Sequence, residues 1–297
     1  MTKYIILLFT VFIPTQIFSQ TALREKIRQI ISDRKADIGV AILHLESGQT
    51  VQINGDKHYP MISVFKFHIA LTVLHQVDEN KLSLDQKIFI PKKALLENTF
   101  SPFRDKYPNG NLTISLKEAL EWMIIESDNN LCDFLIKLIG GVETVSHFIN
   151  NPAFIIKNDE EGMHKNWDAQ FLNTTTPNFT NKLLKYLLVN QLLSEKTSLW
   201  LYKTMVQTSV GKNRIKGKLP SSAEVAHRTG SSFTNDSGLT GAINDIGIIK
   251  LPDEDTLIIS VFVHNTSEKF KNSEEIIADI AKAAWNHFVA NKKNANH

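Results

Sequence analysis

Cysteine is nearly absent from this chain of 297 residues, and Cys132 is the only one. An intramolecular disulfide is therefore impossible, although an exported protein could contain one. The apolar neighbours Leu131, Phe134 and Leu135 indicate that Cys132 is a buried structural thiol.

The sequence also lacks a metal-binding pattern and a surplus of one charge. The ten histidines are dispersed, and no two of them stand four residues apart on a predicted helix. We therefore expect no metal and no other cofactor. The net charge is only +2, and Lys and Arg are scattered rather than gathered in a stripe, so nucleic acid is not an expected partner.

The apolar run at the N-terminus, Tyr4 to Phe12, is too short to span a bilayer comfortably. Lys3 precedes it, and a more polar stretch with the small Ser19 near a plausible cleavage point follows it. This order is typical of a secretory signal peptide, here residues 1–20; an anchored N-terminal helix is the alternative. We expect a periplasmic or secreted protein that does not contact the membrane after the leader is removed.

Helix and strand patterns fall into three groups along the chain. The first group has a helix at 22–31 and strands at 38–45 and 50–53. The last group has strands at 225–230, 242–249 and 256–263 and a helix at 273–289. The group between them, 63–207, reads as helices joined by polar loops.

The economical packing of these groups is an α/β (α+β) fold. It has a five-stranded antiparallel sheet built from both chain ends and flanked by the terminal helices, with an all-helical domain inserted. We therefore expect a discontinuous sheet domain (21–58 and 208–297), a helical domain (59–207) and a ligand cleft between them, in a protein that is a monomer by default.

Ser63 and Lys66 lie at the start of a long apolar run, Ile62–Val77, that has helical spacing. Residues three apart share a helix face, so the lysine amine can reach the serine hydroxyl. A desolvated lysine can serve as the base that activates a serine nucleophile. The same Ser-x-x-Lys pattern at Ser32 and Ser209 lies in polar stretches, where we expect surface residues.

Three further segments carry polar side chains that suit a cleft. Residues 127–129 (Ser-Asp-Asn) either present a hydroxyl and an amide or cap the following helix. Residues 227–232, at a strand end, either bind a carboxylate through an arginine and hydroxyls or guard a sheet edge. In the long connection 151–178, Glu160 and His164 stand one helical turn apart, and a glutamate there is either a base for a water or a solvated charge.

Taken in this order, the motifs resemble those of the class A serine β-lactamases. The resemblance covers essentially the whole mature chain and extends to the flanking residues 98–102 and 211–214. It is greatest for the PER-like extended-spectrum branch, whose loop has a glutamate, a histidine and an asparagine at the spacing of Glu160, His164 and Asn173. That spacing selects Glu160 rather than Glu161.

The resemblance implies a β-lactamase that hydrolyses penicillins and cephalosporins through an acyl-enzyme and confers antibiotic resistance. Ser63 is then the nucleophile, Lys66 takes or relays its proton, and Ser127 protonates the departing nitrogen. Glu160 activates the hydrolytic water, and whether Lys66 or Glu160 is the base for acylation is disputed for the family. Asn129 orients Lys66 and receives the amide of the substrate side chain.

The resemblance also assigns the binding groups. Backbone N–H groups of Ser63 and Ser231 would form the oxyanion hole. Arg228, Thr229 and Ser231 would bind the substrate carboxylate, with Gly230 allowing close approach of the backbone.

Three positions depart from the usual family pattern. Arg228 replaces a lysine, as in the carbenicillin-hydrolysing enzymes, which suggests good activity on carboxypenicillins. His164 replaces an asparagine, as in the PER-like branch, so the loop could fold differently and widen the cleft. Phe100 replaces a Tyr or Trp at the cleft wall and keeps the stacking face.

Three other functions share parts of this pattern. A penicillin-binding D,D-peptidase would lack the loop carboxylate and deacylate slowly. A non-catalytic sensor would need a membrane anchor or a partner domain. An amidohydrolase such as a glutaminase is normally cytosolic and fits poorly with the leader.

Overall fold

The computed structural model of this chain describes residues 14–252 and 254–295. The predicted leader, residues 1–20, lies mostly outside this part, and the first described helix, α1, runs from Pro14 to Ile31. The helix predicted from residue 22 is therefore the C-terminal part of α1. No helix in the described ranges is both long enough and apolar enough to cross a bilayer.

The main sheet joins the two ends of the chain. Its antiparallel strands have the order β2–β1–β10–β9–β8. The strands are β1 Asp37–His44, β2 Thr50–Ile53, β8 Val225–Ser231, β9 Thr240–Lys250 and β10 Thr256–Thr266. β1 pairs with β10 along its whole length, from Asp37 opposite His264 to His44 opposite Leu257. The predicted five-stranded antiparallel sheet is confirmed.

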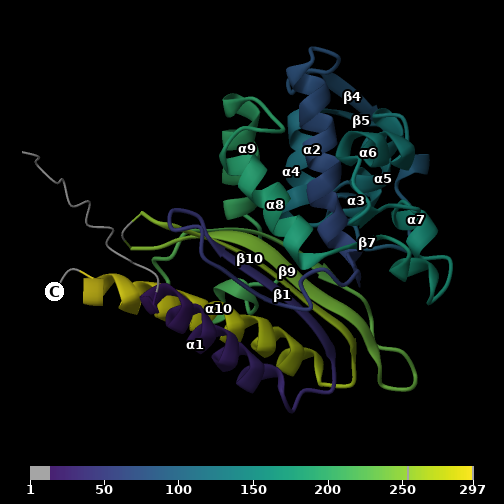
Figure 1. The fold of residues 1–297 in the computed structure, drawn as a ribbon. Helices are drawn as coiled ribbons and strands as arrows, with labels where there is room; N and C mark the ends of the chain where they lie inside the picture. Colours follow the sequence, from purple (N-terminus) through teal and green to yellow (C-terminus); the bar gives the residue numbers. More distant parts are fainter. Residues whose placement is uncertain (1–13, 253, 296–297) are drawn as a thin grey trace, which may run out of the picture.

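Helices cover both faces of this sheet (Figure 1). On one face α1 lies beside α10 (Phe270–Ala295), and Ile27 and Ile280 belong to the apolar core beneath them. The helical region lies on the other face. Because both faces are covered, nearly every residue of β9 and β10 is buried, and neither strand alternates strictly between buried and exposed positions.

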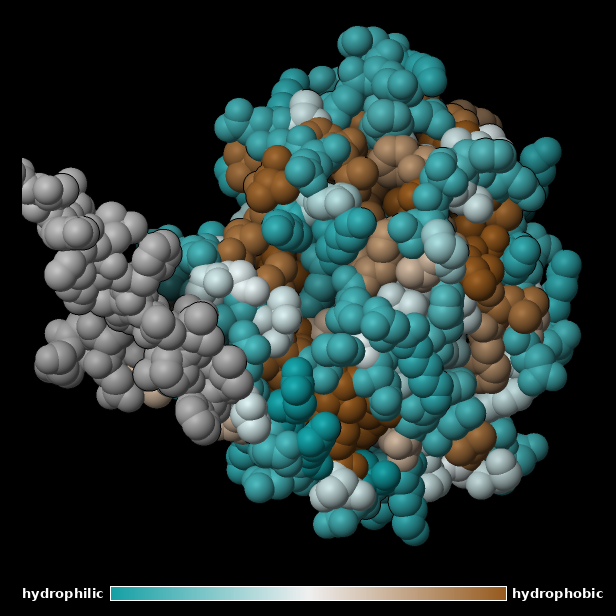
Figure 2. All heavy atoms as spheres, in the orientation of Figure 1, coloured by the Kyte–Doolittle hydropathy of each residue, from teal (hydrophilic) through white to brown (hydrophobic). Residues whose placement is uncertain are grey.

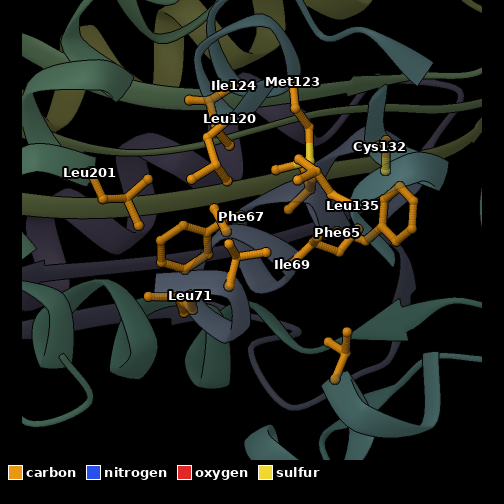
Figure 3. Packing of buried hydrophobic residues seen from close by; sticks show 14 of the residues in the cluster. Phe65, Phe67, Ile69, Leu71, Leu120, Met123, Ile124, Cys132, Leu135 and Leu201 are labelled. Atoms are coloured by element: carbon orange, nitrogen blue, oxygen red, sulfur yellow. The ribbon is translucent and has the colours of Figure 1, made fainter. Parts of the chain in front are cut away.

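A second core lies in the helical region around α2 (Phe65–Asp78). The other α-helices there are α3 Pro102–Lys106, α4 Leu116–Ile125, α5 Asn129–Leu138, α6 Val142–Ile149, α7 Glu160–Met163, α8 Pro177–Leu188 and α9 Glu195–Val206. Phe65 and Phe67 of α2 pack in this core with Met123 of α4 (Figure 3). Cys132 is fully buried here, as predicted, and burial raises the pKa of its thiol well above the usual value.

The region 59–207 is not entirely helical, which corrects the prediction. It contains a two-stranded sheet of β4 (Lys87–Ile90) and β5 (Leu112–Ser115). It also contains a three-stranded sheet of two-residue strands, in the order β3 (Tyr59–Pro60), β7 (Thr174–Thr175), β6 (Phe154–Ile155). In β4 the residues alternate between exposed and buried, because only one face of the small sheet packs on the core.

Polar and charged residues cover most of the face drawn in Figure 2, and hydrophobic residues show through as separate patches. Scattered apolar patches of this kind are normal on a folded protein. The features that bear on function lie instead where the helical region meets β8.

Candidate active site

Ser63 lies in a 3-10 turn, η1 (Ile62–Val64), directly before α2. Ile62 has a positive φ of 46°, which is unusual for a β-branched residue and indicates strain in this turn. Gly230 of β8 passes close by, since a Cβ on it would lie 2.5 Å from the carbonyl oxygen of Met61 and 3.2 Å from the nitrogen of Ser63. Only a residue without a side chain allows this approach, which the sequence predicted.

Lys66 is fully buried at the centre of the site. Its Nζ lies 3.0 Å from Ser63 Oγ, 2.5 Å from Asn129 Oδ1 and 2.6 Å from Glu160 Oε1. It also donates to the carbonyl oxygen of Ser127 at 3.0 Å. A buried amine needs such partners, because an unpaired polar group is costly to bury. The predicted helical spacing thus brings the amine to the serine hydroxyl.

The tripeptide 127–129 both caps a helix and lines the cleft. Asp128 is the N-cap of α5, since its carboxylate accepts a hydrogen bond from the N–H of Leu131 at 2.9 Å. Ser127 and Asn129 line the cleft, and Ser127 has the left-handed φ of 62°. The two interpretations of this segment therefore apply to different residues within it.

Glu160 begins the one-turn helix α7 and is buried beside the serine. Its Oε1 lies 3.4 Å from Ser63 Oγ. His164 turns back on it and donates from Nδ1 to the carbonyl oxygen of Glu160 at 2.6 Å. The side chain of Glu161 is 57 % exposed and lines no part of the cleft. The structure therefore distinguishes the two glutamates as the spacing predicted.

Two side chains fix the backbone of this loop. Asn173 accepts hydrogen bonds from the N–H groups of Lys157 and Asn158, at 2.7 and 3.0 Å. Asp133 of α5, which the sequence did not single out, accepts from the N–H groups of Glu160 and Glu161, at 2.7 and 2.9 Å. Burial and the charges of Asp159 and Glu160 raise the pKa of the Asp133 carboxyl to about 7.

Arg228 is fully buried and does not line the cleft. Its Nη2 donates to Ser127 Oγ at 2.7 Å, and its Nη1 donates to the carbonyl oxygen of Thr229 at 3.1 Å. Burial lowers the pKa of this guanidinium to about 10, so it remains charged at neutral pH. The position differs from the expected carboxylate contact, because Arg228 holds Ser127 instead.

Arg214, which precedes η4 (Ile215–Lys218), supplies the guanidinium that lines the cleft. Its Nη2 donates to Ser231 Oγ at 2.5 Å, and its Nη1 donates to the carbonyl oxygens of Gly230 and Asn244, at 3.0 and 2.8 Å. Glu274 of α10 accepts from its Nε at 3.2 Å. Sequence reasoning missed this role, although residues 211–214 already belonged to the recognised pattern.

The cleft has a volume of about 430 Å³ and brings together most of the predicted residues. Those that line it are Ser63, Phe100, Ser127, Asn129, Glu160, His164, Thr229 and Ser231. Lys66 and Arg228 lie behind this surface, and Gly230 contributes backbone close to the serine. Phe100 is 56 % exposed, as expected of a stacking wall.

The other Ser-x-x-Lys pairs do not form comparable sites. Ser32 is exposed and donates to the carbonyl oxygen of Gln29 at 3.2 Å. Ser209 Oγ donates to Glu126 at 2.7 Å, and Lys212 is exposed. Neither serine hydroxyl is hydrogen-bonded to its lysine.

Among the described residues, one group could share a metal ion, and it lies outside the cleft. It consists of His44, Glu46 and Asp255, at two turns of the main sheet. His44 Nε2 lies 3.4 Å from Asp255 Oδ2. None of the three lines the cleft.

Comparison with known proteins agrees with this geometry. The profile of the beta-lactamase enzyme family matches residues 22–288. The chain is 45 % identical to beta-lactamase VEB-1 of Pseudomonas aeruginosa, over 89 % of each chain. It is 36 % identical to the extended-spectrum beta-lactamase PER-1 of the same organism, over 89 % of this chain and 86 % of that one. The crystal structure of TLA-1 extended-spectrum beta-lactamase superposes with a TM-score of 0.89 at 44 % identity, covering 91 % of this chain and 99 % of that one. The chain therefore belongs to the beta-lactamase enzyme family, as a class A serine β-lactamase of the PER-like branch.

Proposed function

We propose that this β-lactamase opens penicillins and cephalosporins through an ester on Ser63 and hydrolyses that ester with a water activated by Glu160. The observation that carries the proposal is the grouping of Ser63 Oγ, Lys66 Nζ and Glu160 Oε1, with every pair within 3.4 Å. A nucleophile within hydrogen-bond reach of its base is the arrangement that covalent catalysis needs.

In acylation, Ser63 Oγ attacks the lactam carbonyl, so that a C–O bond forms and the C–N bond breaks. The serine proton passes to Lys66 or Glu160, both of which lie within reach of it. Ser127 donates a proton to the departing nitrogen and is resupplied through Lys66, whose Nζ lies 3.4 Å from Ser127 Oγ. In deacylation Glu160 takes a proton from water as the water oxygen attacks the ester carbonyl, the C–O bond to Ser63 breaks, and Glu160 returns the proton to Ser63 Oγ.

Binding would use both ends of the cleft. The carboxylate shared by penicillins and cephalosporins suits the guanidinium of Arg214 and the hydroxyls of Thr229 and Ser231. The N–H groups of Ser63 and Ser231 would stabilise the oxyanion. Asn129 would receive the side-chain amide of the substrate. We infer further that the enzyme acts as a monomer in the periplasm or outside the cell, after removal of residues 1–20.

The test is nitrocefin hydrolysis by the wild type and by Glu160→Gln, with mass spectrometry of the protein. We expect turnover by the wild type. In the variant we expect a covalent adduct to accumulate on Ser63, because acylation still occurs while deacylation is lost. Glu161→Gln is the matched control and should hydrolyse nitrocefin at the wild-type rate, since that side chain is exposed. Equal steady-state rates for Glu160→Gln and the wild type would remove Glu160 from the mechanism.

A further inference from the structure

Three side chains that can ligate a metal lie together at the end of the main sheet opposite the cleft. His44 ends β1, Glu46 follows it in the turn to β2, and Asp255 directly precedes β10. The strand register aligns His44 with the first residue of β8, Val225, whereas the cleft lies at the last residue, Ser231. Because a strand rises about 3.3 Å per residue, the length of β8 separates the two levels by about 20 Å.

The imidazole of His44 is already held in one orientation. His44 is only 7 % exposed, and its ring stacks on the ring of Phe288 in α10, with 4.6 Å between the centroids and 16° between the planes. Its Nδ1 faces Ser47, 2.9 Å from the hydroxyl oxygen and 3.2 Å from the backbone nitrogen. Its Nε2 faces Asp255, whose Oδ2 lies 3.4 Å away. A histidine ligand usually has its second ring nitrogen hydrogen-bonded in this way, which fixes the orientation of the ring.

Two carboxylates face this imidazole. Glu46 Oε2 lies 4.0 Å from His44 Nδ1 and accepts a hydrogen bond from the N–H of Thr256 at 2.9 Å, so Glu46 is tied to the start of β10. One ligand atom from each of the three residues lies within 4.8 Å of the other two. Ligand atoms about 2.0–2.2 Å from a tetrahedral zinc ion are about 3.3–3.6 Å apart, so small rotations of the carboxylates would close the site. The side chains of Glu46 and Asp255 are 40 % and 18 % exposed, which leaves a side open for water as the fourth ligand.

We propose that His44, Glu46 and Asp255 bind a zinc ion that links the β1–β2 turn to the β9–β10 turn. An imidazole with two carboxylates is a donor set that suits Zn²⁺, and the ion neutralises both carboxylates. The three ligands come from opposite ends of the chain, so only the folded protein brings them together and the bound ion stabilises it. The same separation explains why the spacing of histidines in the sequence gives no sign of the site. The inference does not depend on the proposed function, because the ion lies far from the cleft.

The experiment titrates the chelator-treated protein with ZnCl₂ by calorimetry and measures its melting temperature with and without the metal. We expect one zinc ion per chain and a rise of about 5 °C or more at a hundredfold excess of Zn²⁺ over Kd. His44→Gln and Asp255→Asn should lose both the binding and the rise. Ser47→Ala keeps the three ligands but releases the ring, so its affinity for Zn²⁺ should fall about tenfold or more. The kcat/KM of the wild type for nitrocefin should be the same with and without Zn²⁺.

His147→Gln is the matched control, since His147 is an exposed histidine of α6 outside this group, and it should bind Zn²⁺ as the wild type does. Asp255→Asn keeps the test decisive if His44→Gln fails to fold, because Asp255 lies in a turn and is partly exposed. A wild type without saturable Zn²⁺ binding overturns the inference, and so does unchanged binding by Asp255→Asn. A loss of nitrocefin hydrolysis on saturation with Zn²⁺ would place the ion in the cleft and would also overturn it.

Discussion

The ring of His68 on α2 stacks on the ring of Phe154 in β6, with 4.5 Å between the centroids and 23° between the planes. His68 is fully buried, and neither of its ring nitrogens has a hydrogen-bond partner among the described residues. Burial lowers the pKa of His68 to about 3, so the folded protein keeps this side chain neutral two residues after Lys66.

His68 should make the protein sensitive to acid. The unfolded chain binds a proton at this side chain below its ordinary pKa of 6.5, whereas the folded protein does so only below about 3. The contribution of neutral His68 to the free energy of unfolding is thus fully present above pH 6.5. It is lost as the pH falls from 6.5 toward about 3, by about 1.4 kcal/mol for each unit between the two pKa values. We expect His68→Met to gain unfolding free energy relative to the wild type as the pH falls from 6.5 to 4, measured by urea titration. The exposed His147→Met should show no such gain, and a variant with the wild-type pH dependence would contradict this account.

Asp133 should have the opposite pH dependence. In the folded protein the Asp133 carboxyl has a pKa of about 7, above the ordinary 3.8. Between pH 3.8 and 7 the folded protein therefore keeps a proton on this carboxyl that the unfolded chain has lost. The stability from this proton is complete below pH 3.8 and disappears as the pH rises toward 7. Asp133→Asn carries no such charge, so its melting temperature relative to that of the wild type should rise between pH 4 and pH 7. Asp236→Asn, at an exposed position, is the control. If the difference in melting temperature between Asp133→Asn and the wild type is the same at pH 4 and pH 7, Asp133 does not titrate in this range.

Arg228→Lys tests what the buried guanidinium contributes. A lysine can still donate to Ser127 but cannot at the same time bond the carbonyl oxygen of Thr229 with a second nitrogen in a fixed plane. We expect carbenicillin turnover to fall by about tenfold, the effect of losing one hydrogen bond from a charged group. Steady-state kinetics on carbenicillin and nitrocefin measure this, and turnover of carbenicillin equal to or better than that of the wild type would count against the idea.

Arg214→Lys tests the carboxylate end of the cleft. The lysine keeps a charge opposite Glu274 but loses the fork that reaches Ser231, Gly230 and Asn244. We expect KM for benzylpenicillin to rise by about tenfold to a hundredfold with a smaller change in kcat, because a charge-assisted contact to the substrate is lost. Lys212→Ala, an exposed neighbour in the same loop, should leave KM unchanged. A variant with normal KM and reduced kcat would place Arg214 outside substrate binding.

The local sequence pattern was sufficient to predict those parts of the fold in which one physical signal dominates. The helical spacing after Ile62 predicted α2 and the meeting of Ser63 with Lys66. The β4 segment Lys87–Ile90 alternates in burial but not in its residue types, because the exposed position 89 is a phenylalanine, so a strand of four residues carries little signal inside a helical region. Strands of two residues, such as β3, form through pairing with distant segments and leave no pattern of their own.

The misassigned roles depend on three-dimensional packing. Arg214 and Arg228 look equally suitable for a carboxylate in the sequence, and only the packing of β8 decides which guanidinium faces the cleft. Asp133 looks like a solvated residue of α5, yet it binds a backbone 27 residues away along the chain. Contacts over such separations are set by the fold as a whole, which single-sequence reasoning cannot supply.

The pairing of β1 with β10 also decides when the enzyme becomes active. β10 is the middle strand of the main sheet and follows its partner β1 with the whole helical region between them. A growing chain that has not yet produced residues 256–266 cannot hold β1 and β9 together, and so cannot bring Gly230 against the turn that bears Ser63. A fragment that ends before residue 256 therefore lacks the assembled site, however much of the helical region it contains.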